Sequence, residues 1–172
     1  MHGPDGGCAV TIEEFVDTGG RALPRFATAL TCDPHLAEDV VQEVLLRAAP
    51  RWGRITAGGP PEPYLRRMVV NEYLGLRRRR AFHDVPASPA DLTGLARPTE
   101  DPDYGEREEM LARIRALPPK QRAVLALRYY AGLADGDIAD VLGCRASTVR
   151  AHASRAIAAL RADEFAKTGG NP

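Results

Sequence analysis

The sequence has little of what marks a secreted, metal-binding or membrane-spanning protein. Only three cysteines occur in 172 residues, Cys8, Cys32 and Cys144, and none of them forms a C-x-x-C pair. An odd number of widely spaced cysteines predicts neither a disulfide framework nor a zinc site. No apolar run approaches the roughly 20 residues that span a bilayer, and the first residues lack the basic and apolar regions of a signal peptide. We therefore expect a cytoplasmic protein with no metal and no membrane insertion.

Residue patterns that support enzyme chemistry are missing as well. The four histidines are scattered along the chain, at His2, His35, His83 and His152. No glycine-rich phosphate motif occurs, and no cysteine and histidine share a spacing typical of a nucleophile with its base. These absences predict a protein with no catalytic residue and no cofactor.

Lysine is scarce, and the charge that arginine supplies is unevenly distributed. Of 23 basic residues only Lys120 and Lys167 are not arginine, and 23 acidic residues bring the net charge to +0. Counted by segment, the net charges are −4, +5, −6 and +5 over residues 1–65, 66–80, 81–109 and 110–172. Two basic segments separated by an acidic one indicate two surfaces for a polyanion, and the planar guanidinium of arginine suits both phosphate and guanine.

Sustained strand alternation is absent, and helical periodicity dominates the chain. Residues 81–105 carry prolines and acidic side chains without apolar periodicity, which is typical of a flexible linker. The sequence therefore predicts an all-α fold with two small helical domains joined by an acidic flexible linker. The expected bounds are a tail (1–10), a first domain (11–80), the linker (81–105), a second domain (106–163) and a tail (164–172).

Apolar side chains at helical spacing identify the expected core. Helices are expected at about 12–30, 34–48 and 63–80 and again from near 106, with a loop rich in glycine and proline at 53–63. Gly19, Gly20 and Pro24 are expected to break or kink the first helix, whereas Asp33 and Pro34 are typical of the start of the second. The residues expected to face inward are Phe15, Val16, Leu23, Phe26, Leu30, Ala37, Val40, Val41, Val44, Leu45, Ala48, Leu65, Met68, Val69, Leu76, Met110, Leu111, Ile114, Leu117, Val124, Leu127 and Tyr130.

The segment from residue 135 to 156 has the spacing of a helix-turn-helix. This motif needs a small residue where its helices cross, a turn residue that tolerates positive φ, and a branched apolar residue on the second helix. Ala139, Gly143 and Val149 supply these at offsets of 4 and 10. A plain helical hairpin is the alternative, because Ala-x-x-x-Gly alone is common. The full spacing and the basic flank favour a motif that binds DNA.

The second helix of such a motif enters the major groove, where side chains of its N-terminal half reach the base edges. Arg150 and Arg155 are the expected base-reading residues, and Arg145, Thr148 and His152 are expected to contact phosphates. A solvated helix face is the alternative for each arginine. The full set expected to contact duplex DNA is Arg145, Ser147, Thr148, Arg150, Ala151, His152, Ser154 and Arg155.

The first basic segment combines arginines with aromatic side chains. Cations next to aromatics suit single-stranded DNA, because the backbone charge is neutralised and unstacked bases find flat partners. An arginine run alone is weak evidence, since it is often only a solvated helix end. The set expected to contact a single strand is Trp52, Tyr64, Arg66, Arg67, Asn71, Arg77, Arg78, Arg79 and Arg80.

Several linked motifs together resemble an extracytoplasmic-function (group four) sigma factor of RNA polymerase, most nearly the actinobacterial SigE-like group. They are LAEDVVQEVLLRA (36–48), YLRRMVVNEYLGLRRRR (64–80), LPPKQRAVLALRYYAGLADGDIADVLG (117–143) and STVRAHASRAIAALR (147–161). The resemblance covers residues 11–162. It implies an initiation factor whose first domain melts and reads the −10 element and whose second domain reads the −35 element. The alternative is a helix-turn-helix regulator that is not a polymerase subunit, but a regulator would carry a receiver or ligand domain in place of the first helical block.

The resemblance also implies partners and residue roles. The partners are RNA polymerase core, through its beta and beta-prime subunits, and promoter DNA, and the family allows an anti-sigma factor. The polar face of the second helix matches the family's surface for the polymerase clamp, at Asp39, Gln42, Glu43 and Arg47; an ordinary solvated face is the alternative. The loop 53–63 matches the pocket for a flipped −10 base, and Asn71 matches an asparagine of the family.

Overall fold

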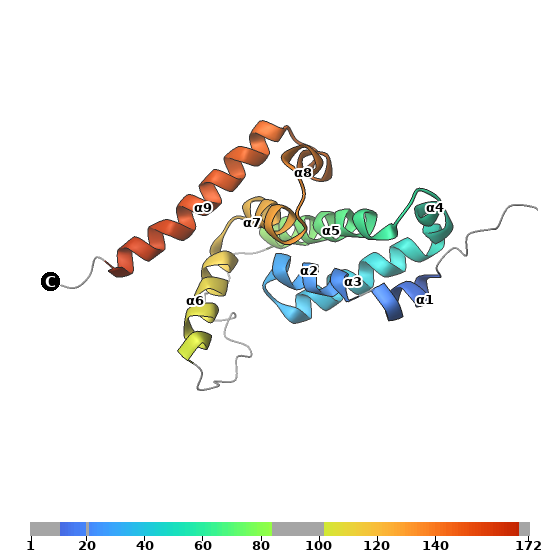
Figure 1. Cartoon of the computed structure of the whole chain (residues 1–172), viewed down its shortest axis with the longest axis horizontal. Coiled ribbons are helices and arrows are strands. Elements are labelled where there is room, and N and C mark those ends of the chain that lie inside the picture. Colours follow the sequence, from blue (N-terminus) through green and yellow to red (C-terminus); the bar gives the residue numbers. More distant parts are fainter. Residues whose placement is uncertain (1–10, 20, 84–101, 169–172) are drawn as a thin grey trace, which may run out of the picture.

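The computed structural model describes residues 11–19, 21–83 and 102–168, and every regular element in these ranges is a helix (Figure 1). The N-terminal helices are α1 (Ile12–Glu14), a π-helix (Phe15–Gly19), α2 (Ala22–Thr31), α3 (Pro34–Ala48), a 3₁₀ turn (Ala49–Arg51), α4 (Trp52–Ala57) and α5 (Pro61–His83). The C-terminal helices are α6 (Pro102–Ala116), α7 (Pro119–Leu125), a π-helix (Ala126–Tyr130), α8 (Asp135–Leu142) and α9 (Ala146–Thr168). The predicted all-α fold with two helical domains is confirmed.

The predicted linker is shorter than expected at both ends. Helix α5 extends to His83 and helix α6 begins at Pro102, so both helices enter the predicted segment 81–105. The remainder, 84–101, lies outside the described residues. No helix in the described ranges is both long and apolar enough to cross a membrane.

The start of α3 follows the sequence closely. Asp33 is extended and its Oδ1 accepts hydrogen bonds from the backbone N–H groups of His35 (3.0 Å) and Leu36 (3.1 Å). Pro34 occupies the first turn, where a missing N–H costs nothing. The apolar stripe that follows is buried, except that Leu45 is half-buried. The cap therefore fixes where α3 begins and which face it turns to the core.

The predicted first helix is in fact three pieces. After α1, capped by Thr11 and Glu14, the chain forms the π-helix Phe15–Gly19 before α2 begins. A π turn holds an extra residue, so it rotates the side chains that follow relative to an α-helix. As a result Phe15 is buried, whereas Val16, predicted to face inward, is 46% exposed.

Helices α2, α3 and α5 enclose the N-terminal core. Phe26, Leu30, Val40, Val44 and Leu65 are fully buried there. The predicted core residues Met68 and Leu76 pack against this cluster but are only partly buried. Most of the predicted inward face of these helices is thus confirmed.

Helices α7, α8 and α9 pack around a second group of buried residues, which joins the N-terminal group in one apolar cluster. Leu117, Val124 and Leu127 are buried as predicted. Three other predictions are wrong: Met110 and Leu111 of α6 and Tyr130 are exposed. Tyr130 ends a π-helix, which again rotates the predicted face, and the main packing partner of α6 is α9 rather than a closed core.

The predicted loop 53–63 is mostly helical. Helix α4 covers Trp52–Ala57, and the Thr56 hydroxyl donates to the carbonyl of Trp52 over 3.0 Å. Only residues 58–60 separate α4 from α5, and Gly59 takes a φ of 124°, which favours glycine. Glycine and proline therefore mark a turn here rather than a long loop.

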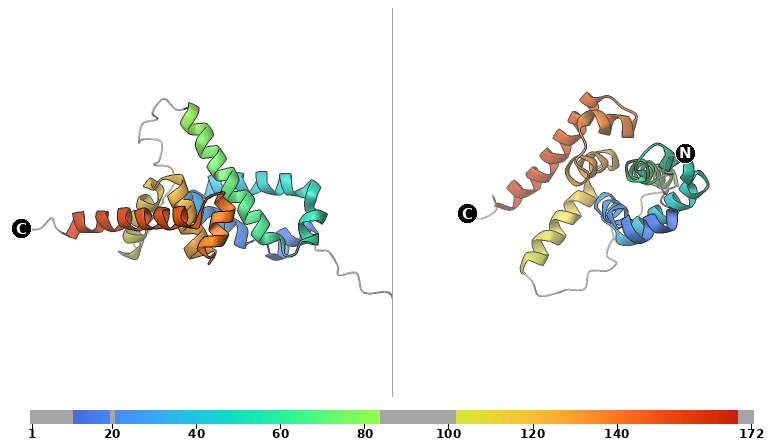
Figure 2. Two further views of the ribbon diagram at one scale, coloured as in Figure 1. Left: turned by 90° about the horizontal axis from the view of Figure 1, so that it is seen from above. Right: turned by 45° about the vertical axis from the view of Figure 1, so that its right-hand side comes forward.

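The two domains meet where α2 ends. Cys32 takes the left-handed conformation (φ 54°), which ends α2. The last carbonyl groups of the helix then have no partner within it and can accept hydrogen bonds from the second domain. Arg115 Nε donates to the Cys32 carbonyl over 2.7 Å, and Arg122 Nη1 donates to the Thr31 carbonyl over 3.1 Å. Figure 1 and the right-hand view of Figure 2 show α7, which carries Arg122, between α9 and the N-terminal helices. Guanidinium groups of one domain thus cap a helix of the other.

Arg122 is the buried centre of this contact. It is 4% exposed, also donates to the carbonyls of Arg115 and Leu117, and lies 5.8 Å from the centre of the Tyr73 ring. Burial lowers the pKa of Arg122 and raises the pKa of Tyr73, because both charged forms lose water. A buried cation with this many acceptors is a structural group rather than a surface charge.

We predict that Arg122→Ala destabilises the protein by about 3 kcal/mol, because several buried carbonyls lose a charged donor. The free energy of unfolding from urea denaturation measures this loss. Lys120→Ala, on the exposed face of the same helix, serves as the control and should change stability by less than about 0.5 kcal/mol. Equal effects of the two substitutions would contradict the role of Arg122.

Candidate nucleic-acid and polymerase interfaces

The helix-turn-helix forms as its spacing predicts. Gly143 ends α8 with a φ of 62°, and the following N–H of Cys144 donates to the Ala139 carbonyl over 3.0 Å. Ala139 and Val149 are buried where α8 and α9 pack. The positive φ at Gly143 and the small side chain of Ala139 let the two helices approach closely.

Helix α9 exposes most of the residues predicted to contact duplex DNA. Ala153 and Ala156 are buried against the core, which turns the opposite face to solvent. The predicted residues that are exposed are Arg145, Ser147, Thr148, Arg150, Ser154 and Arg155, whereas Ala151 and His152 are half-buried. The structure therefore exposes six of these eight residues, at the start of α9 and along its first half.

His152 is less exposed than most residues of the predicted set. Its Nδ1 is buried with no hydrogen-bond partner among the described residues. Burial lowers its pKa, and the nearby charges of Lys120 and Arg155 lower it further. The neutral imidazole is therefore favoured, and the contact of His152 with phosphate stays a prediction.

A shallow hollow of about 420 Å³ lies beside Arg150. Arg150 Nη1 is 4.0 Å from Asp135 Oδ2, and Arg128 donates to the other oxygen of Asp135. The hollow is lined by Arg128, Arg150, Ser154, Ile157, Ala158 and Arg161. Sequence reasoning missed Arg128 and Arg161, although Arg161 lies eleven residues after Arg150 and so shares its helix face.

A larger cavity of about 740 Å³ lies at the turn between α4 and α5. Of the residues predicted to contact a single strand, Tyr64 and Arg67 line it. Arg51 and Arg54 line it too and were missed, because the predicted loop hid the helical spacing that brings them together. Val141 of α8 also lines this cavity, so the second domain reaches it.

Trp52 and Arg66, which were also predicted to contact the strand, pack within the N-terminal domain instead. Trp52 is 9% exposed and packs against Phe15, with ring centres 5.4 Å apart. Arg66 bonds to Glu62 and lies 5.8 Å from the centre of the Phe26 ring. Trp52 therefore belongs to the core rather than to the exposed surface where the predicted contact with a strand would lie. Arg66 is held against its own domain.

The basic end of α5 presents its arginines unequally. Asn71, Arg78, Arg79 and Arg80 are exposed. Arg77 is half-buried, and its charge offsets part of the rise that burial causes in the pKa of Tyr73. Arg79 forms an ion pair with Glu72. The run of four arginines is thus not four equivalent cations.

The polar face of α3 is exposed at Asp39 and Gln42. Glu43 and Arg47 pair with each other over 2.6 Å, and Glu72 together with Glu43 raises the pKa of Arg47. Beside this face lies an apolar groove of about 590 Å³, and Leu46 at its edge is 71% exposed. Sequence reasoning missed Leu46, because it fell outside the predicted inward stripe.

The described residues contain no candidate metal site. They contain no group of three or more His, Cys, Asp or Glu side chains that could hold a metal ion. Cys32 and Cys144 are free thiols, and burial raises the pKa of Cys32, which keeps it protonated. The cationic surfaces at the α4–α5 turn and on α9, and the polar face of α3, are therefore the candidate functional sites.

Comparison with known proteins gives these surfaces a family. Residues 15–82 match the family model of sigma-70 region 2, and residues 107–160 match the model of sigma-70 region 4. The RNA polymerase sigma-E factor of Streptomyces coelicolor is 32% identical over 161 residues, which cover 94% of this chain and 90% of that protein. The ECF RNA polymerase sigma factor SigL of Mycobacterium tuberculosis H37Rv is 31% identical, covering 89% of this chain and 88% of its own.

Solved structures agree on the fold. The sigma factor RpoE of Bartonella quintana, solved with the anti-sigma factor NepR, has a TM-score of 0.63 and 23% identity, and the match covers 87% of this chain and 93% of that one. CnrH, solved with the cytosolic domain of CnrY, has a TM-score of 0.61 and 21% identity, covering 90% and 88%. A regulator built only around a helix-turn-helix does not account for the match to region 2. The chain therefore belongs to the sigma-70 family, in its extracytoplasmic-function group, and is a sigma factor that directs RNA polymerase to promoters.

Proposed function

We propose that the two domains of this sigma factor divide promoter recognition, with residues 11–80 binding core polymerase and the −10 element and residues 106–163 reading the −35 element. The observation that carries this division is the presence of two separate cationic surfaces, one at the α4–α5 turn and one on α9. The protein acts in the cytoplasm without catalytic activity of its own. The Bartonella relative was solved with an anti-sigma factor, and we propose a partner of that class here.

The cavity at the α4–α5 turn suits an unpaired base. Its volume of about 740 Å³ lies within the range of small-molecule sites. Extruding a base costs a few kcal/mol, which a stacking partner and neutralisation of the backbone can offset. Tyr64 supplies the flat partner, and Arg51, Arg54 and Arg67 supply the charge. Asn71 and Arg78 continue this face along α5, and Arg80 is exposed near the end of the helix.

The exposed face of α9 suits the major groove of the −35 element. Arg150 and Arg155 are exposed in its N-terminal half, where a recognition helix reaches base edges. Their guanidinium groups can bond bidentately to guanine. Arg145 and Thr148 lie at the start of the helix, where contacts to phosphate orient the protein.

We predict that Arg150→Ala weakens −35 binding by about 1–3 kcal/mol and relaxes the preference at one base position, as loss of a bidentate contact does. Arg145→Ala is the matched control: it should weaken all sequences alike and reduce the salt dependence. Binding to a set of singly substituted −35 duplexes at several salt concentrations separates the two. If Arg150→Ala weakened binding to all the duplexes equally, Arg150 would not be a base-reading residue.

Polymerase is expected to bind the exposed face of α3. Asp39, Gln42, Glu43 and Arg47 form a polar surface next to the apolar groove that Leu46 borders. A polar rim around an exposed apolar side chain is typical of a protein interface. The surface lies on a different helix from the DNA-binding cations, so both partners can bind at once.

We predict that Asp39→Arg combined with Glu43→Gln weakens binding to core polymerase at least tenfold while the protein stays folded. Glu43→Gln avoids placing a second cation beside Arg47. The control carries the same charge changes on α8, as Asp140→Arg with Asp137→Asn. Competition for core and run-off transcription from a promoter library measure the effect, and equal competition by parent and variant would exclude this face.

Reading both elements requires the two domains to separate. The −10 and −35 elements lie about 25 base pairs apart, or about 85 Å at about 3.4 Å per pair. Val141 contacts the proposed −10 cavity, and α8 with α9, 8 and 23 residues long, reaches at most about 50 Å from it. The contact between α2 and the Arg115–Arg122 segment must therefore open on a promoter.

We predict that weakening this contact favours binding to a promoter that carries both elements. Arg115→Ala with Tyr130→Ala removes the 2.7 Å bond to Cys32 and the ring contact with Phe26, which together are worth about 1–3 kcal/mol. Affinity for a fragment with both elements should rise about tenfold, and affinity for a −35 duplex alone should not change. A rise for both probes would show that the contact does not oppose opening.

A further inference from the structure

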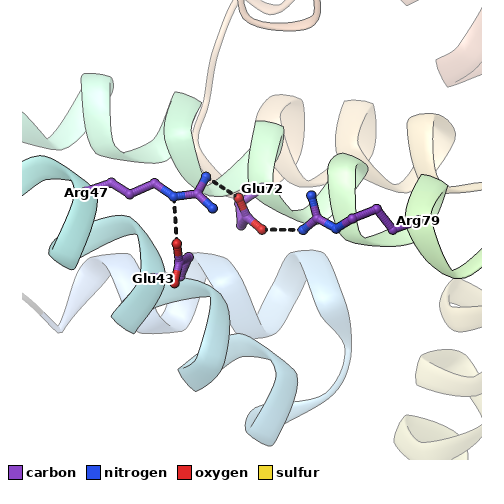
Figure 3. A network of polar contacts seen from close by, with 4 residues as sticks. All are labelled: Glu43, Arg47, Glu72 and Arg79. Carbon is purple, nitrogen blue, oxygen red and sulfur yellow. Dashed lines mark hydrogen bonds and ion pairs between the residues drawn. The ribbon is translucent and has the colours of Figure 1, made fainter.

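A buried carboxylate lies between the two proposed surfaces of the N-terminal domain. Glu72, in the middle of α5, has a side chain that is 7% exposed. Its Oε2 is 2.6 Å from Arg47 Nη1 of α3, and its Oε1 is 2.8 Å from Arg79 Nη2 near the end of α5. Figure 3 shows Glu72 between the two arginines, with Glu43 bonded to Arg47.

Gly75 lies on the path that the Arg79 side chain takes to Glu72. Glu72 and Arg79 are seven residues apart, so they lie on the same helix face two turns apart. Position 75 falls between them, three residues after Glu72 and four before Arg79. A Cβ atom at Gly75 would lie 3.4 Å from Arg79 Nη1. A longer side chain would therefore occupy the space that the guanidinium crosses.

The contact changes which arginines are available to DNA. A carboxylate this buried needs cationic partners, and Arg47 and Arg79 supply them. The charge of Arg79 is thereby cancelled at close range. The Arg79 side chain is 58% exposed, but this ion pair holds it. Arg78 and Arg80 are also exposed and have no ion pair with any described residue. The four-arginine run thus contains one cation that is committed to the protein itself.

We propose that Glu72 is a positioning residue that holds Arg79 against α5, over Gly75, and withholds it from the DNA strand. The proposal rests on the proposed function of the basic end of α5. Through Arg47, the same carboxylate ties the DNA-binding end of α5 to the polymerase-binding helix α3. Glu72 thus adds a polar link to the apolar packing between α3 and α5.

The test is the salt dependence of binding of the full chain to a labelled twelve-nucleotide thymidine strand. Each phosphate contact to a single strand contributes about 0.7 to the slope of log affinity against log salt. Arg78→Gln should lower the slope by about 0.7, whereas Arg79→Gln should leave it unchanged. Glu72→Gln should raise it by about 0.7 by releasing Arg79, and Glu72→Gln with Arg79→Gln should restore the parent value. An equal fall for Arg78→Gln and Arg79→Gln would overturn the proposal.

Substitutions at Gly75 test position without changing charge. Gly75→Leu should displace Arg79 and raise the slope as Glu72→Gln does. Gly75→Ala, whose Cβ makes an ordinary contact, is the matched control and should keep the parent slope. The slope could instead rise with Glu72→Gln and stay unchanged with Gly75→Leu. The effect would then come only from removing the negative charge of Glu72, and the positioning role would be overturned.

Stability separates this proposal from the proposed function. If Glu72 and Arg79 bond, the shifts in urea midpoint caused by Glu72→Gln and Arg79→Gln are not additive in the double variant. Additive shifts would overturn the contact itself. If instead Arg78→Gln leaves the slope unchanged while the urea shifts are non-additive, the contact stands and the basic end of α5 is not the strand-binding surface.

Discussion

The capping of α2 by two arginines of the other domain is the contact on which the arrangement of the molecule depends. A helix ends with carbonyl groups that have no partner within the helix, and its C-terminus carries partial negative charge. Here the carbonyls of Thr31 and Cys32 receive Arg122 and Arg115. Because Arg122 also bonds to carbonyls of its own domain, one buried guanidinium fixes the end of α2 and the start of α7 together.

This contact combines directed polar bonds with apolar packing, because buried residues of α7 and α8 belong to the same cluster as those of α2, α3 and α5. The buried Arg122 and the exposed Arg115 both donate to backbone acceptors across it, together worth about 2–3 kcal/mol, and the aromatic contact between Phe26 and Tyr130 adds a partly exposed pair. Such a sum defines one closed arrangement, yet binding energies of large partners easily exceed it. Under the proposed division of promoter recognition, this contact orders the free protein and opens on the promoter.

Local signals in the sequence predict local structure well in this chain. The Asp33–Pro34 start of α3 and the spacing of Ala139, Gly143 and Val149 are confirmed because each depends on backbone geometry within a few residues. The π-helices could not be predicted, because one extra residue in a turn does not interrupt the apolar spacing of the sequence. It does rotate the inward face of the helix. This is why Val16 and Tyr130 were assigned to the core and are exposed.

The site residues that sequence reasoning misjudged are those whose partners are distant in the chain. Trp52 packs against Phe15, and Arg66 lies over the ring of Phe26. Arg79 and Arg47 form ion pairs with the same carboxylate, that of Glu72. From composition alone, every arginine is an equal candidate for binding a polyanion. In the folded chain, some arginines are bonded to other groups of the protein and others are not. An arginine bonded to a buried carboxylate or carbonyl stabilises the protein, and an arginine left in water attracts phosphate. A chain with no net charge can therefore bind DNA, because burial decides which of its charges remain free.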